Sequence, residues 1–169
     1  MADSIILIGF MGCGKSTVGR ILADMLDYSF IDTDTEIERK CNMSISDMFA
    51  QKGEPYFRLM EKEVILGIDN TESHVISCGG GSILNPDILK HLKEIGKLVY
   101  LRANPDTTLK RTAGSNARPL LNSDDRRERI MNLMADRENI YLNASDMAID
   151  TDLLSAKEVA INIKKQLKY

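Results

Sequence analysis

Short apolar runs alternate along the chain with longer segments in which apolar residues recur every third or fourth position. The short runs predict strands that are buried on both faces, and the longer segments predict helices. Alternating strands and helices are typical of βαβ units, which build a parallel sheet. We therefore expect an α/β protein with five strands, at Ser4–Gly9, Ser29–Asp32, His74–Ser77, Lys97–Leu101 and Met147–Asp150.

Capping residues mark several of the predicted helix starts. Asn85-Pro86 and Asn104-Pro105 each place a capping asparagine before a proline at the first helical position. Residues 155–158 form a capping box that opens the last helix. The other helices are expected at Lys15–Leu26, at Asp34–Lys40, and at Ile45–Ile68 with a break at Gly53 and Pro55.

One polar stretch, Thr112–Asp125, lacks any apolar period. A loop of this length in a compact domain is usually a moving lid or disordered. The rest of the chain shows no linker, so we expect a single domain over residues 1–169.

Composition narrows the range of functions. The chain has 169 residues, of which 43% are hydrophobic and 28% charged, which is typical of a globular protein with a full core. Its net charge of -3 offers no basic footprint for nucleic acid or an anionic membrane, so neither is an expected partner. Three cysteines without metal-ligand spacing, and an N-terminus unlike a signal peptide, favour the reducing cytoplasm.

The strongest chemical signal is the segment Gly9–Ser16 (GFMGCGKS), which fits the phosphate-loop pattern G-x-x-x-x-G-K-[ST]. It follows an apolar strand and opens a helix, as the pattern requires. The glycines let backbone N–H groups converge on a phosphate, and the helix N-terminus adds partial positive charge. Lys15 would reach the β- and γ-phosphates, and the Ser16 hydroxyl would ligate Mg²⁺. The motif predicts a bound nucleotide but says nothing of the acceptor.

Two aspartates at the end of the second predicted strand are candidates for the acceptor side. Asp32 and Asp34 would lie at the carboxyl edge of the sheet, where open parallel sheets bind ligands. One carboxylate could hold Mg²⁺ or its water while the other contacts an acceptor hydroxyl. A pair of helix-capping aspartates is an equally good interpretation of these two residues alone.

Further candidates are a triple glycine and two arginines. Gly79–Gly81 directly follows the third strand, which implies either positive φ angles or a close backbone approach to a ligand. A flexible turn is the alternative. Arg58 and Arg137 lie in helical segments among apolar residues, where a guanidinium suits bidentate binding of a carboxylate. For either arginine alone, a surface ion pair is the more common role.

Taken together, these segments resemble the shikimate kinases along nearly the whole chain. The motifs occur in the order of that family: GFMGCGKST, DTD, GEPYFRLME, SCGGG, RPLL and RENIY, at Gly9–Thr17, Asp32–Asp34, Gly53–Glu61, Ser77–Gly81, Arg118–Leu121 and Arg137–Tyr141. The resemblance implies a three-layer α/β/α P-loop fold with a five-stranded parallel sheet. It also implies a substrate-binding segment at 33–61 and a mobile lid at 112–125.

The activity implied by the resemblance is ATP-dependent phosphorylation of shikimate to shikimate 3-phosphate, with Mg²⁺, in the pathway to chorismate and the aromatic amino acids. By this likeness Ser16 and Asp32 hold the metal, and Lys15, Asp34 and Arg118 are the catalytic residues. The acceptor-binding residues would be Asp34, Arg58, Gly79, Gly80, Gly81 and Arg137, with Glu61 orienting Arg58. The nucleotide-binding residues would be Gly12, Cys13, Gly14, Lys15, Ser16, Thr17, Arg111, Arg118 and Thr151, with Asp152 near the base.

Other functions remain open from the sequence. A gluconate or nucleoside-monophosphate kinase would share the loop and the fold, although the triple glycine and the RPLL segment favour shikimate. A nucleotide-binding regulatory module without catalysis could lose Arg118, which this chain keeps. Cys13 lies beside Lys15 at a helix N-terminus, which favours a reactive thiolate, with a shielded thiol as the equal alternative. We expect a monomer, because no exposed apolar stripe is evident.

Overall fold

A computed structural model describes residues 3–113 and 126–168 of the chain. Its centre is a five-stranded sheet in which every neighbouring pair is parallel, in the order β2-β3-β1-β4-β5. The predicted parallel sheet of five strands is confirmed. The elements in chain order are β1 (Ser4–Ile8), α1 (Lys15–Leu26), β2 (Ser29–Asp32), α2 (Thr33–Cys41), α3 (Ile45–Leu66), β3 (His74–Ser77), η1 (Ser82–Leu84), α4 (Pro86–Ile95), β4 (Gly96–Arg102), α5 (Pro105–Thr112), α6 (Arg126–Ala144), β5 (Met147–Asp150) and α7 (Ala156–Leu167).

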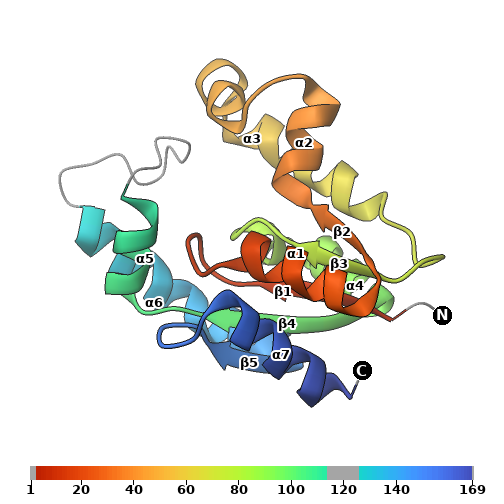
Figure 1. Ribbon diagram of the computed structural model, residues 1–169. Coiled ribbons are helices and arrows are strands. Elements are labelled where there is room, and N and C mark those ends of the chain that lie inside the picture. Colours follow the sequence, from red (N-terminus) through yellow and green to blue (C-terminus); the bar gives the residue numbers. More distant parts are fainter. Residues whose placement is uncertain (1–2, 114–125, 169) are drawn as a thin grey trace.

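Helices cover both faces of the sheet, which gives the predicted three layers (Figure 1). Successive side chains of a strand point to opposite faces. In β1, Ile5 and Leu7 pack with α1 and α7, whereas Ile6 and Ile8 pack with α4, α6 and the end of α3. The central strand is therefore buried on both faces, as its unbroken apolar run predicts.

The helices begin where the capping residues predict. Asn85 accepts hydrogen bonds from the backbone of α4, Asn104 from that of α5, and Ser155 forms a capping box with Glu158. Gly53 interrupts α3 with φ 79° and ψ 170°, so the predicted break is confirmed. In Figure 1, α2 and α3 lie above the β2 edge of the sheet, and they share a small apolar cluster of their own.

Some boundaries differ from the sequence-based expectation. α2 begins at Thr33, one residue early, because Asp32 caps it, and η1 follows the triple glycine where no helix was expected. Thr112, the first residue of the expected lid, is the last residue of α5. The rest of that segment from residue 114 onward lies outside the described residues. No helix in the part of the chain described here is long and apolar enough to cross a membrane.

Candidate active site

The phosphate-loop segment joins β1 to α1 and curls around the first turn of that helix. Gly12 and Gly14 have φ angles of 76° and 100°, which strain any residue with a side chain. Gly14 directly precedes α1, so the helix N-terminus faces the hollow inside the loop. This hollow, which we call the P-loop cavity, has a volume of about 440 Å³ and is lined by residues 12–18 together with Asp32, Asp34 and Arg111. Such a cradle of N–H groups binds phosphate.

Lys15 is nearly buried within the loop. Its Nζ donates to the carbonyl oxygens of Gly9 (2.9 Å) and Phe10 (3.0 Å) and contacts Cys13 Sγ at 3.6 Å. These bonds hold the two ends of the loop together and keep the ammonium group at the floor of the cavity. Cys13 is only 1% exposed, so the structure supports a shielded thiol rather than a reactive one.

The Ser16 hydroxyl and the Asp32 carboxylate, the two expected metal ligands, are in contact. Ser16 Oγ donates to Asp32 Oδ2 at 2.6 Å, and Ser77 Oγ lies 3.4 Å from Ser16 Oγ. The other oxygen of Asp32 accepts from the backbone N–H groups of Asp34 and Thr35. Asp32 is therefore both the cap of α2 and a neighbour of Ser16. The capping interpretation is confirmed for this residue, and the metal-binding interpretation stays a prediction.

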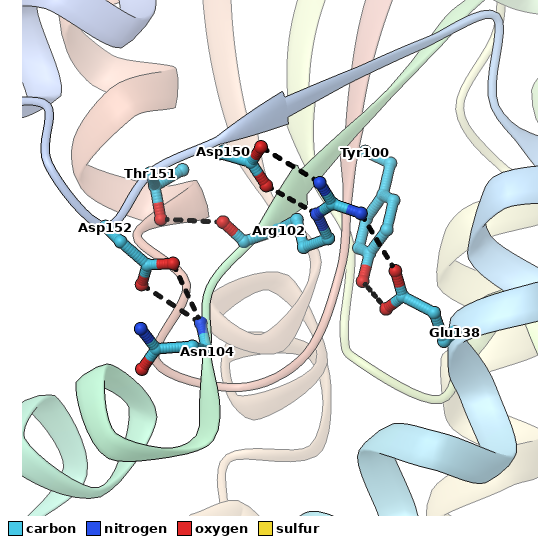
Figure 2. A network of polar contacts seen from close by, with 7 residues as sticks. All are labelled: Tyr100, Arg102, Asn104, Glu138, Asp150, Thr151 and Asp152. Carbon is cyan, nitrogen blue, oxygen red and sulfur yellow. Dashed lines mark hydrogen bonds and ion pairs between the residues drawn. The ribbon is translucent and has the colours of Figure 1, made fainter.

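Arg111 and Thr151 close the far side of the P-loop cavity. The Arg111 guanidinium donates to the carbonyl oxygens of Gly12 and Cys13 and to both oxygens of Thr151. It thus links the phosphate loop to the segment that follows β5. Asp152 turns away toward α5, where its carboxylate accepts from the backbone N–H of Asn104 (Figure 2).

A second cavity adjoins the first and contains both candidate arginines. We call it the arginine cavity; its volume is about 220 Å³, and its lining includes Arg58, Arg137 and Gly81. The Arg137 guanidinium also lies over the Phe10 ring, 5.9 Å from its centroid. Asp34, Gly79 and Gly80 line both cavities. Asp34 therefore lies at the junction, where a group bound in one cavity would meet a group bound in the other.

Arg58 is held by two carboxylates of different exposure. Its Nη1 donates to Glu61 Oε2 at 2.8 Å, and its Nη2 donates to Glu54 Oε1 at 3.1 Å. Glu61 is 2% exposed and also accepts from Ser82 Oγ, whereas Glu54 is 52% exposed. Burial opposes the charge on Arg58, but the two carboxylates, Glu61 above all, outweigh it and raise the pKa of the guanidinium. Glu61 thus fixes the orientation of Arg58, as the resemblance implies.

The triple glycine leaves room for side chains of the protein itself. A Cβ on Gly81 would lie 2.8 Å from both Nη atoms of Arg58, and one on Gly79 would lie 2.9 Å from Glu61 Oε1. The positive φ angles that the sequence suggested as one explanation are not present in Gly79–Gly81. Close approach is the physical reason for Gly79 and Gly81, because any larger residue there would displace side chains that line the arginine cavity.

Three polar residues of the site received no role from the sequence. Ser77 contacts Ser16, the buried Thr33 hydroxyl accepts from Gly79 N at 3.1 Å, and the Tyr141 hydroxyl donates to the Gly80 carbonyl at 2.5 Å. Each lies within a quoted motif, yet its partner is distant in the chain.

Arg118, the expected lid arginine, lies outside the described residues.

Fold and site together define a class of protein. A phosphate loop at the carboxyl edge of a parallel sheet opens, past an aspartate, onto a second cavity with two arginines. This is the arrangement of a P-loop kinase, which binds a nucleotide and an acceptor side by side.

Comparison with known proteins gives the family. A family model described as shikimate kinase matches residues 11–168. The shikimate kinase of Moorella thermoacetica is 44% identical over 168 residues, which cover 99% of this chain and 96% of that protein. The chain belongs to the shikimate kinase family.

Solved structures agree with this assignment. A shikimate kinase from Acinetobacter baumannii, solved in complex with shikimate, has a TM-score of 0.95 at 33% identity, over 99% of this chain and 94% of that chain. The shikimate kinase from Aquifex aeolicus has a TM-score of 0.82 at 35% identity, over 98% of this chain and 96% of that chain. The predicted fold and family are confirmed.

Proposed function

We propose that this protein transfers the γ-phosphoryl group of ATP to a hydroxyl of shikimate, giving shikimate 3-phosphate on the pathway to chorismate and the aromatic amino acids. The observation that carries the proposal is the pair of arginines in one cavity that meets the P-loop cavity at Asp34. Shikimate has a carboxylate and several hydroxyls, so one end suits the guanidinium groups and the other suits Asp34. The family and the shikimate-bound relative from Acinetobacter baumannii support the same substrate.

On the acceptor side, Arg58 and Arg137 bind the shikimate carboxylate. A planar guanidinium donates two parallel hydrogen bonds to a carboxylate, which fixes both position and orientation. Asp34, at the junction of the cavities, orients the attacking hydroxyl and accepts its proton as the new bond forms. The turn Gly79–Gly81 brings its backbone close to the same molecule.

On the nucleotide side, the N–H groups of residues 12–17 bind the phosphates of ATP. Lys15 leaves the loop carbonyls to reach the β- and γ-phosphates, where its charge offsets that of the transferring group. Arg111 and Thr151 lie where the cavity extends beyond the loop, which suits the adenosine end. Arg118 remains a prediction from the sequence as a further source of positive charge.

The Ser16 and Asp32 side chains suit a magnesium ion. Both present hard oxygen donors, and their 2.6 Å contact shows that they reach one point beside the loop. Mg²⁺ commonly takes one or two protein oxygens and completes its shell with water and substrate phosphate. The ion would neutralise phosphate charge; the protein itself orients ATP and shikimate.

We further propose that the enzyme acts as a monomer in the cytoplasm, with ATP and shikimate as its partners.

A coupled assay of ADP release tests the proposed function. The purified protein, ATP and Mg²⁺ would be combined in turn with shikimate, gluconate and each nucleoside monophosphate. We expect rapid ADP release with shikimate alone and a product whose mass equals that of shikimate plus one phosphoryl group. Faster turnover with gluconate or a nucleotide would contradict the proposal, and ATP binding without turnover of any acceptor would indicate a regulatory module.

A further inference from the structure

Two buried tyrosines stack on each other behind the triple glycine. Tyr100 of β4 and Tyr141 of α6 have ring centroids 5.0 Å apart with an interplanar angle of 28°. Their hydroxyls go in different directions. Tyr100 donates to Glu138 Oε2 at 2.6 Å, inside the polar network of Figure 2, whereas Tyr141 donates to the carbonyl oxygen of Gly80. Only the second of these two bonds touches the turn that lines the arginine cavity.

Gly80 lies between the phosphate loop and Tyr141. A Cβ on Gly80 would be 3.4 Å from the carbonyl oxygen of Gly9, 3.6 Å from Met11 N and 3.7 Å from Tyr141 Oη. The Gly80 carbonyl shares a planar peptide unit with the N–H of Gly81. A hydrogen bond to this carbonyl therefore fixes the orientation of the whole peptide unit. The Arg58 guanidinium packs against Gly81, the second residue of that unit.

Tyr141 also belongs to the helix that carries the other arginine. Arg137 precedes it by four residues on α6, so the two side chains lie on the same face of the helix. Glu138, next to Arg137, anchors this part of α6 to the sheet through Tyr100 and Arg102 (Figure 2). The hydrogen bond from Tyr141 thus joins the element bearing Arg137 to the turn that supports Arg58.

We propose that Tyr141 is a positioning residue that sets the spacing between Arg58 and Arg137, and through it the affinity for the acceptor carboxylate. The inference rests on the proposed function of the arginine cavity. Tyr141 is not among the residues that line the arginine cavity. It acts through the Gly80–Gly81 peptide unit and through its contact with Arg137 on the same helix.

The hydrogen bond from the Tyr141 hydroxyl to the Gly80 carbonyl does not depend on pH in the physiological range. Burial raises the pKa of Tyr141 to about 12, although Arg137 opposes the shift through its charge and its side-chain contact with the hydroxyl. The hydroxyl therefore stays protonated and donates at any physiological pH. A phenylalanine would keep the stacked ring and leave the Gly80 carbonyl without this donor. A buried carbonyl that loses its donor shifts toward another partner, which would turn the peptide unit.

The test compares Tyr141→Phe with Tyr100→Phe. Both variants keep the ring and lose the hydroxyl, but only the Tyr141 hydroxyl reaches the triple glycine and Arg137. We expect Tyr141→Phe to raise the KM for shikimate about three- to tenfold, the factor of one buried hydrogen bond, with the KM for ATP unchanged. Tyr100→Phe leaves Glu138 its contact with Arg102, so it should lower the melting temperature comparably and leave both KM values unchanged.

Shikimate methyl ester provides a second measurement on the same proteins. The ester lacks the negative charge that the arginines bind. Tyr141→Phe should therefore raise the KM for the ester by a smaller factor than the KM for shikimate. The inference is overturned if Tyr141→Phe changes only the melting temperature, or if the two variants raise the KM for shikimate equally. It is also overturned if Tyr141→Phe raises the KM for the ester by the same factor as the KM for shikimate. Failure of the wild-type protein to phosphorylate shikimate would overturn the proposed function instead.

Discussion

The phosphate-binding part of the P-loop cavity comes from one continuous segment, residues 12–18, whereas the arginine cavity collects side chains from α2, α3, α6 and the turn after β3. In the first, backbone groups and a few glycine φ angles create the binding surface. In the second, each charged side chain needs support from another element, as Arg58 needs Glu61. A local segment can be specified by a short motif, but an assembled cavity depends on how distant elements pack.

The largest effect should come from the residue at the junction of the two cavities. Asp34→Asn keeps the size of the side chain but removes the acceptor of the proton, so we expect turnover to fall about 10²–10⁴-fold. ATP binding, measured by calorimetry, should stay unchanged, because the loss falls on the acceptor side. Asp32→Asn should instead raise the Mg²⁺ concentration needed for half-maximal rate. Near-normal turnover of Asp34→Asn would contradict the assignment.

A second prediction concerns the support of Arg58. Glu61→Gln removes its buried partner, and we expect the KM for shikimate to rise about tenfold, the effect of one charge-assisted hydrogen bond. Glu54→Gln is the matched control: it removes the exposed partner on the same helix, and such pairs contribute at most about 1 kcal/mol. Steady-state kinetics on both variants decide the matter. Equal effects would mean that burial of Glu61 does not matter for the site.

The thiols test how tightly the phosphate loop is packed. Cys13 and Cys78 are buried, Cys41 is partly exposed, and burial raises the pKa of Cys78. Because the thiolate is the reactive form, we expect iodoacetamide to modify Cys41 first in the native enzyme. Peptide mass spectrometry over time would follow each site. Early modification of Cys13 with parallel loss of activity would show that the loop opens readily and exposes this buried side chain.

The smallest effect is expected at the sheet edge beside Thr151. Arg102 forms an exposed ion pair with Asp150 and holds the pKa of that carboxyl below its usual range (Figure 2). The contribution of this ion pair to the free energy of unfolding is therefore present above the ordinary pKa of aspartate. It disappears as the pH falls through the lowered pKa of Asp150. Solvent screens the pair, so Asp150→Asn should cost less than about 1 kcal/mol at neutral pH.

Urea unfolding of the wild type and Asp150→Asn, at neutral pH and well below the ordinary aspartate pKa, would measure this difference. We expect the two proteins to converge in acid and to have the same KM for ATP. A loss of several kcal/mol, or a weaker affinity for ATP, would show that the nucleotide side depends on this single pair.

The same contrast explains what the sequence could predict. The strands, the helix caps at Asn85 and Ser155 and the phosphate loop depend on neighbouring residues, so patterns within a few positions predict them. The contacts of Thr33 with Gly79 and of Tyr141 with Gly80 join residues 46 and 61 positions apart. They arise only when the sheet brings these elements together, and in the sequence Tyr141 is only an apolar neighbour of Arg137 at the end of the RENIY motif.

Carboxylate recognition by the arginine cavity is the central claim, and the kcat/KM of the wild-type enzyme for shikimate and for its methyl ester tests it most directly. The two molecules share the ring and the hydroxyls, and they differ in the charge that Arg58 and Arg137 would bind. Losing charge-assisted hydrogen bonds of about 1.5–3 kcal/mol should lower kcat/KM for the ester about 10- to 100-fold. An ester phosphorylated as efficiently as the acid would show that the two arginines do not bind the carboxylate.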